Sequence, residues 1–300
     1  MEKYTNFRDK GTGIAPFLPP PGDSTLFPAS ALPWNLLLLA VLLLKLILAL
    51  PLLAAGLALP QAHTLALRTL LWGRLRLDYQ VAGVKRSALR RGGAAHQLQP
   101  GTLYAANFSS ALLAVALPLL AARPVRFLVP DAGAYYALTP GQLATYTMAG
   151  RSLDPARFGT AVETVALGGS VVWVLLPEGT CSNGKSVLPF QTDRAGLQAL
   201  LGEGDGEAKA TLTPLAVRVG TALTTPLGGS RWRLAARVLL SHSGAGTVRV
   251  RRGEPVALGG EDPALDGVRA ALNGGEKHRL VARTLGPAQK RAFLRASGRA

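Results

Sequence analysis

An apolar segment at positions 36–59, LLLLAVLLLKLILALPLLAAGLAL, constrains the fold more than any other feature of this sequence. Lys45 is its only charged residue, and as a straight helix it would be about 36 Å long, enough for a bilayer core of roughly 30 Å. The polar and mixed residues before it exclude a signal peptide. We therefore expect a membrane anchor at 34–60, preceded by a polar N-terminal segment at 1–33.

Two features bear on how this anchor sits in a membrane. Pro51 lies inside it, and an interior proline kinks a helix, which suits either a bent span or a hairpin that returns to the same side. Residues 68–91 are strongly basic, and LALRTLLWGRLRL at 65–77 has the pattern of an interfacial helix. Because positive charge favours the cytosolic side, we expect the C-terminal part of the chain to face the cytosol.

Beyond the anchor, strands and helices alternate in the sequence. We expect strands at 102–108, 125–129, 170–176, 210–219, 231–240 and 247–253. We expect helices after Ser109 or Ser110, near 132–149, within 155–167, after Asp193 as a cap, and from about Asp262. This order predicts an α/β domain over 61–300, with a mixed sheet flanked by helices and a basic helical end.

Charge and rare residues narrow the range of functions. The chain carries 33 Lys and Arg against 17 Asp and Glu, and a net charge of +16 favours anionic partners. Cys181 is the only cysteine, so no intrachain disulfide can form. The four histidines are scattered without ligand spacing, and we expect no metal site.

The loop PEGTCSNGKSVLPF at 177–190 admits two interpretations. Residues 179–186 match the nucleotide-binding pattern G-x-x-x-x-G-K-[ST] in every position. That pattern needs a helix directly after the Gly-Lys-Ser end, but Pro189 follows three residues after Ser186. No later apolar run ends in a metal-holding Asp, so a nucleotide hydrolase is a remote alternative.

The second interpretation rests on an ordered set of motifs. LLPEGTCSNGKSVLPF resembles the Pro-Glu-Gly-Thr block of the glycerolipid acyltransferase family, DPARF at 154–158 sits where that family has an Arg-bearing block, and LTPLAVRV at 212–219 resembles its last block. The two ends, EKYTNFRDKGTGIAPFLP and ALNGGEKHRLVARTL, are similar to a fungal membrane-bound subgroup, the lysophosphatidic acid:oleoyl-CoA acyltransferases. The resemblance thus covers nearly the full chain.

The resemblance implies a function and a set of contacts. It implies transfer of an acyl group from acyl-CoA, as co-substrate, to lysophosphatidic acid or a related lysolipid, with no bound cofactor and no nucleic-acid partner. It also implies a place on a membrane, at the endoplasmic reticulum or on lipid droplets, among lipids as partners. The substrate-binding residues it points to are Asn107, Arg157, Glu178, Gly179, Thr180, Ser182 and Lys185.

The catalytic block of the family is where the sequence departs from the pattern. The family has His and Asp in Asn-His-x4-Asp, whereas this chain has Phe108 and Leu113, so neither can take a proton. The alternative is a lipid- or acyl-CoA-binding member of the family without catalysis. Cys181, Asp131 and His96 are candidates for a substitute base or nucleophile, and sequence spacing leaves the base unassigned.

Overall fold

The computed structural model describes residues 2–19, 32–55, 60–71, 74–149, 154–202, 211–240, 246–258, 265–273, 279–282 and 284–298. Its strands are β1 (Leu75–Val81), β2 (Leu103–Ala106), β3 (Val125–Asp131), β4 (Ala134–Leu138), β5 (Thr160–Val162), β6 (Val172–Leu175), β7 (Ser186–Val187), β8 (Thr211–Val219), β9 (Gly246–Arg252), β10 (Val256–Ala257) and β11 (Arg279–Leu280). Its α-helices are α1 (Leu32–Ala55), α2 (Pro60–Leu71), α3 (Arg86–Gly92), α4 (Leu113–Leu120), α5 (Pro140–Ala149), α6 (Arg194–Leu201), α7 (Arg231–Leu240), α8 (Asp266–Leu272) and α9 (Pro287–Ala296). Short 3-10 helices are η1 (Glu2–Phe7), η3 (Gly93–His96), η4 (Pro155–Arg157) and η5 (Thr221–Leu223).

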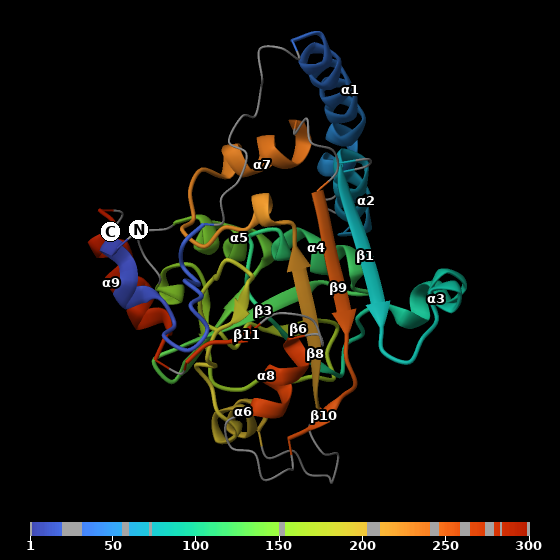
Figure 1. Cartoon of the computed structure of the whole chain (residues 1–300). Coiled ribbons are helices and arrows are strands. Elements are labelled where there is room, and N and C mark those ends of the chain that lie inside the picture. The colour runs from blue at the N-terminus through green and yellow to red at the C-terminus, as the bar shows by residue number, and fades with distance from the viewer. Residues whose placement is uncertain are drawn as a thin grey trace.

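A mixed sheet forms the centre of the described structure, in the order β1-β9-β8-β2-β6-β3-β4-β5, with β10 beside β8 (Figure 1). Strands β8, β2, β6 and β3 are parallel, and the outer strands β4, β5 and β9 run antiparallel to their inner neighbours. A separate pair, β7 with β11, is parallel. The α/β class with a mixed sheet, expected from the sequence, is confirmed.

The central strands β2 and β6 consist of apolar and aromatic residues, as expected for strands with both faces covered. Every residue of β2 is buried. On one face the core includes Leu117 of α4, Tyr146 of α5 and Val238 of α7. On the other face it includes Leu197 of α6 and Val268 of α8. Because β8, β2, β6 and β3 run parallel, their carboxyl ends meet at one edge of the sheet. Ligand sites of open α/β sheets usually lie at this edge.

Several expected elements are wrong in type or extent. Residues 231–240 form a helix rather than a strand, because Leu234 and Val238 recur at a spacing of four, which is helical rather than alternating. The helix expected within 155–167 is instead η4 followed by β5, and 132–149 divides into β4 and α5. The helical pattern at 65–77 ends with α2, and its last residues begin β1.

Of the helix caps expected from the sequence, the cap of α6 is confirmed and the serine cap of α4 is wrong. Asp193 caps α6 as predicted, since its Oδ1 accepts a hydrogen bond from the Gly196 N–H at 2.8 Å. Ser110 does not cap α4, which begins only at Leu113. Its hydroxyl instead donates to the carbonyl of Leu223 at 2.6 Å, and this ties the segment after β2 to η5.

The apolar segment at 36–59 lies largely in α1, which extends beyond the sheet at one end of the molecule and packs against α2 and α7 (Figure 1). Its large aliphatic side chains are mostly exposed, for example Leu44 at 58% and Ile47 at 65%. Over the described residues, no helix has both the length and the apolar character needed to cross a membrane. The membrane helix expected at 34–60 is therefore not confirmed.

Asn107 continues the pairing of β2 with β8 through its side chain. Its amide nitrogen donates to the carbonyl of Val217 at 2.8 Å, and its Oδ1 accepts the Val217 N–H at 2.6 Å. Both groups of the side chain are buried and satisfied by the backbone of β8. Asn107 thus fixes the chain where it leaves the sheet and enters the candidate site.

Replacing Asn107 by alanine should lower the free energy of unfolding by roughly 2–4 kcal/mol, because two hydrogen bonds are lost and the Val217 N–H and C=O stay buried. Urea denaturation of the detergent-solubilised chain measures this. The matched control, Thr145→Ala, removes an exposed hydrogen bond to Gly141 and should change stability by less than about 0.5 kcal/mol. Equal effects of the two substitutions would contradict the anchoring role of Asn107.

Candidate active site

The loop at 177–186 leaves the carboxyl end of β6 and lies in the interior of the protein. Glu178, Thr180 and Ser182 are almost completely buried, whereas Lys185 is exposed. After Ser186 the chain continues as strand β7 rather than as a helix. The nucleotide-binding interpretation is therefore unsupported, because in the described structure the Gly-Lys-Ser end leads into a strand and does not open a helix.

Glu178 is the central acidic group of this loop. One carboxylate oxygen, Oε1, accepts a hydrogen bond from the backbone N–H of Phe108 at 3.1 Å, and the backbone of Leu188 also hydrogen-bonds to the carboxylate. Burial raises the pKa of Glu178 to about 8, opposed by these backbone bonds and by the charges of Arg269 and Lys290. The other oxygen, Oε2, has no hydrogen-bond partner among the described residues.

Gly179 is required at its position by space and by conformation. Its φ of 62° lies in the left-handed region, and a Cβ added there would come within 2.8 Å of the Pro130 carbonyl oxygen. The hydroxyl of Tyr146 donates to the Gly179 carbonyl at 2.8 Å. The loop is thereby held close against the end of β3.

Cys181 lies next to a buried lysine of α9. Lys290 Nζ donates to the Cys181 carbonyl oxygen at 2.6 Å, and the lysine side chain is 3% exposed. Burial lowers the pKa of Lys290 to about 8 and raises the pKa of the Cys181 thiol to about 11. A thiol with that pKa is a weak nucleophile at neutral pH, which argues against Cys181 as an acyl carrier.

Some hydroxyl groups around the loop have a hydrogen-bond partner, and others have none among the described residues. Ser182 Oγ accepts the Gly184 N–H at 3.2 Å. Thr180 Oγ1 and Ser109 Oγ are buried without a partner among the described residues. Buried hydroxyls without partners are rare in folded proteins and point to a bound polar group or water.

The cations expected near the loop are arranged differently from the sequence interpretation. Arg157 is exposed and pairs with Asp154 at 3.6 Å, so its role in substrate binding stays a prediction. Arg269 of α8 is instead buried, and its Nη2 donates to the carbonyls of Val187 and Val281. Sequence reasoning missed Arg269 and Lys290 because each lies in a segment with several charged residues, which is typical of a solvated surface, and only the fold brings them inward.

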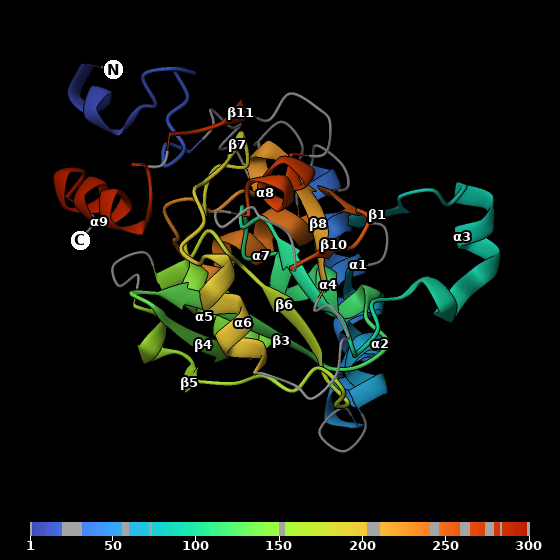
Figure 2. The ribbon, with the colours of Figure 1, turned by 90° about the horizontal axis from the view of Figure 1, so that it is seen from below.

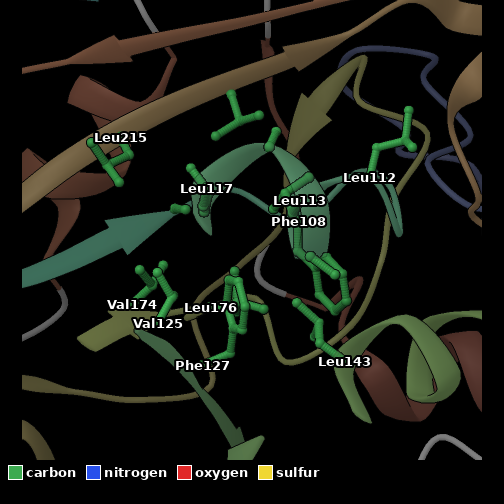
Figure 3. Close-up of a cluster of buried hydrophobic side chains, with 14 of the residues drawn as sticks. Phe108, Leu112, Leu113, Leu117, Val125, Phe127, Leu143, Val174, Leu176 and Leu215 are labelled. Carbon is green, nitrogen blue, oxygen red and sulfur yellow. The ribbon is translucent and has the colours of Figure 1, made fainter. Parts of the chain in front are cut away.

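Phe108 and Leu113, the residues in place of the family's His and Asp, are fully buried in the apolar core (Figure 3). The ring of Phe108 stacks on that of Tyr146, with ring centroids 6.3 Å apart. A His and an Asp at these positions would lie among apolar side chains. Neither Phe108 nor Leu113 can accept a proton, so these two positions provide no base in this chain.

Asp131 and His96, the remaining candidates for a substitute base, lie in different parts of the structure relative to the loop. Asp131, at the end of β3, is close enough to Tyr146 to act on its pKa, and it pairs with Arg291 at 3.6 Å. The described contact of His96 is through its backbone carbonyl, which accepts the Tyr79 hydroxyl at 2.9 Å, and Tyr79 belongs to the edge strand β1. Asp131 therefore borders the loop, whereas His96 lies toward the far edge of the sheet. Over the described ranges, no group of three metal-binding side chains is present.

The N-terminal segment covers the loop. The Asn183 side chain donates to the carbonyls of Ala15 and Leu18 at 2.9 and 3.0 Å, and its backbone N–H donates to Pro16. Phe17 packs in a small apolar cluster with Phe293 of α9. Figure 2 shows this N-terminal segment beside α9, on the side of the molecule opposite α3.

Taken together, the fold and the site define an α/β protein with a buried Glu-Gly-Thr loop at the carboxyl edge of its parallel strands. A scan against models of known protein families gives no match. The chain is 33% identical over 303 aligned positions to lysophosphatidic acid:oleoyl-CoA acyltransferase 1 of Saccharomyces cerevisiae, which spans 98% of this chain and 96% of the yeast protein. The chain belongs to the family of that acyltransferase.

The comparison with solved structures gives a match to the 1-acyl-sn-glycerophosphate (LPA) acyltransferase PlsC of Thermotoga maritima. It is 13% identical in sequence, with a TM-score of 0.38, and the alignment covers 80% of this chain and 93% of that chain.

Glu178→Gln should alter how stability depends on pH. Glu178 has a pKa of about 8 when folded and about 4.3 when unfolded, so the folded state holds a proton that the unfolded state has lost between these values. The contribution of Glu178 to the free energy of unfolding of the wild type therefore falls as the pH rises from about 5 to 8. Glutamine removes this loss, and relative to wild type the variant should gain at least about 1 kcal/mol between pH 5 and pH 8.

Urea unfolding at both pH values measures the gain. The matched control is Glu163→Gln, a substitution at an exposed position, which should show no such trend. An identical pH dependence of wild type and Glu178→Gln would mean that Glu178 is ionised throughout this range.

Proposed function

We propose that this chain transfers the acyl group of acyl-CoA to lysophosphatidic acid or a closely related lysolipid and forms a diacyl phospholipid. The observation that carries the proposal is the similarity, over nearly the whole chain, to a yeast protein named for this reaction. The buried Glu178 loop supports it, because its free carboxylate oxygen and hydroxyls face the interior where an acceptor would bind.

The acceptor's phosphate and glycerol need different groups. We assign the phosphate to the hydroxyls of Thr180 and Ser182 and to Lys185, with positive charge from buried Lys290 behind the loop. The free glycerol hydroxyl is assigned to Glu178 Oε2. Asn183 and its contacts with residues 15–18 must open for the lipid to reach these atoms.

Glu178 also supplies a route for the proton that the family's histidine would take. In this scheme Oε2 accepts the hydroxyl proton while the acceptor oxygen attacks the thioester carbonyl carbon. The C–S bond then breaks, an ester C–O bond forms, and the CoA sulfur leaves with the proton returned by Glu178. A carboxyl group with a pKa near 8 is a stronger base than an exposed glutamate and is suited to this transfer.

The competing function is a lipid- or acyl-CoA-binding protein without catalysis. It is favoured by one observation, the placement of Phe108 and Leu113 in the apolar core where the family has its base and its partner. In this alternative the loop still binds the lipid, but no acyl group is transferred and no product forms.

Acyl transfer should depend on Glu178 and on pH. With labelled oleoyl-CoA and lysophosphatidic acid in detergent, Glu178→Gln should reduce kcat by roughly 10²- to 10⁴-fold, the range for loss of a general base. The wild-type rate should rise as pH increases through about 8, because the carboxylate must be ionised to accept the proton. The exposed Glu163→Gln control should keep the wild-type rate and profile.

Two results separate the functions. Saturable lysophosphatidic acid binding with no product from the unmodified chain would establish the binding protein instead of the enzyme. Product formation that is unchanged in Glu178→Gln would refute Glu178 as base and leave Asp131, beside the loop, as the next candidate.

We also propose that α1 anchors the protein in a membrane. Its exposed leucines form an apolar surface with no partner among the described elements on that side, and such a surface is unfavourable in water but favourable in lipid. Insertion into one side of a bilayer, next to α2, would leave the sheet in the cytosol as the basic residues predict. Residence at the endoplasmic reticulum or on lipid droplets stays a prediction.

The triple variant Leu43→Ser, Leu44→Ser and Ile47→Ser should bind liposomes at least tenfold more weakly, because each buried aliphatic side chain contributes about 1.5–3 kcal/mol. Flotation with phosphatidylcholine vesicles measures binding. Leu280→Ser, at an exposed leucine of β11, is the control and should float like wild type. Undiminished flotation of the triple variant would exclude α1 as the anchor.

A further inference from the structure

Ser109 and Ser110, two adjacent serines shortly after β2, are both buried but differ in what their hydroxyl groups contact. The Ser110 hydroxyl donates to the carbonyl of Leu223 at 2.6 Å and accepts the backbone N–H of Leu112 at 3.2 Å. Ser109 is 1% exposed, and its Oγ has no hydrogen-bond partner among the described residues. Ser110 therefore stabilises the fold through its side chain, whereas the hydroxyl of Ser109 is a buried polar group with an unmet hydrogen bond.

The backbone holds Ser109 between two segments of the candidate site. The carbonyl of Phe108, one residue earlier, accepts the N–H of Ser182 in the loop at 2.8 Å. The carbonyl of Ser109 itself accepts the N–H of Thr225, in the segment after η5, at 3.1 Å. The hydroxyl is thus held next to the loop at 177–186 by main-chain contacts in which it takes no part.

The side chain of Ser109 lies against Gly184 of this loop. A Cβ added at Gly184 would come within 3.2 Å of the Ser109 Cβ and 3.6 Å of its Oγ. The Gly184 N–H donates to Ser182 Oγ, and Lys185 is the next residue of the chain. Ser182 and Lys185 are among the groups to which we assign the acceptor's phosphate. The hydroxyl of Ser109 therefore borders the part of the loop that would hold this phosphate.

We propose that Ser109 is a further binding residue for the acceptor, and that its hydroxyl donates a hydrogen bond to the phosphate monoester of lysophosphatidic acid. The inference rests on the proposed function, which places that phosphate at the loop. A phosphate monoester presents charged acceptor oxygens, and hydrogen bonds to charged oxygens are stronger than those between neutral groups. A ligand oxygen also supplies the partner that the buried hydroxyl lacks, and burial without a partner is unfavourable.

The phosphate fits this hydroxyl better than the other parts of the acceptor do. The acyl chain is apolar and offers no hydrogen-bond acceptor along its length. The free glycerol hydroxyl is assigned to Glu178 Oε2, which has no partner among the described residues either. The phosphates of acyl-CoA have the same chemistry as that of the acceptor, so the test distinguishes these two sources.

The test removes the Ser109 hydroxyl and measures binding. Ser109→Ala is compared with Thr213→Val, a control that removes another buried hydroxyl without a described partner, within β8. Titration calorimetry on the full chain in detergent measures the affinity for 1-oleoyl-lysophosphatidic acid, for 1-oleoylglycerol, which has no phosphate, and for CoA. Ser109→Ala should bind lysophosphatidic acid roughly ten- to hundredfold more weakly, the range for a lost hydrogen bond to a charged group. It should bind the other two as wild type does, and Thr213→Val should bind all three unchanged.

Kinetics of acyl transfer give a second readout. Ser109→Ala should raise the KM for lysophosphatidic acid by a similar factor and leave kcat and the KM for oleoyl-CoA nearly unchanged. The phosphate takes no part in the bond changes, so the lost contact weakens the ground state and the transition state equally. A fall in kcat with an unchanged KM for lysophosphatidic acid would overturn the proposal.

Thermal unfolding separates binding from folding. Ser109→Ala and Thr213→Val should have a Tm no lower than wild type, because neither hydroxyl has a hydrogen bond to lose. Ser110→Ala should lower the Tm, because the carbonyl of Leu223 and the N–H of Leu112 lose a partner. A loss of stability in Ser109→Ala as large as that in Ser110→Ala would show a structural role and overturn the proposal.

The remaining outcomes separate this contact from the acyl transfer itself. Unchanged affinity of Ser109→Ala for lysophosphatidic acid would overturn the contact, even where both proteins form product. Weaker binding of CoA, with lysophosphatidic acid unaffected, would overturn it in favour of a site for the phosphates of acyl-CoA. Selective loss of lysophosphatidic acid binding, in a protein whose wild type forms no product, would support the contact and refute only the acyl transfer.

Discussion

The backbone N–H of Phe108 and the carboxylate of Glu178 form the contact on which the rest of the site depends. This hydrogen bond joins the segments that follow β2 and β6, two neighbouring parallel strands. Asn107 binds the backbone of β8 on the other side, so three strand ends are fixed within a few residues. The polar groups of the loop are oriented by this connection, and the apolar core beneath supports it.

Much of this arrangement follows from local sequence. The run at 170–176 before Pro177 and the turn residues after it place a buried strand and a loop correctly, since continuous apolar runs are typical of central parallel strands. Asp193 caps α6 because a short acidic side chain directly before a helix can accept a hydrogen bond from a backbone N–H of its first turn. Glu178 was assigned to the loop from its motif, and the structure places its carboxylate at the centre of the buried groups.

Other features depend on contacts between distant residues and could not be read locally. Lys290 and Arg269 have no local sequence signal of burial, and only the docking of α8 and α9 buries them. Arg76 of β1 and Arg249 of β9 line one cavity because β1 pairs with β9, residues 75–81 with 246–252, a register that no short motif encodes. Residues 231–240 were expected as a strand because they contain two runs of three apolar residues, yet Leu234 and Val238 pack as a helical stripe against the core.

The covering of the loop joins the two ends of the chain. Asp9 Oδ1 accepts the backbone N–H of Ala282 at 3.1 Å, and the rings of Tyr4, Phe7 and Phe17 surround Phe293. During synthesis Tyr4, Phe7 and Phe17 emerge long before Phe293, so their ring contacts can form only when the chain is nearly complete. The covering of the Glu178 loop is therefore complete only after α9 has left the ribosome and residues 4–17 have packed against it.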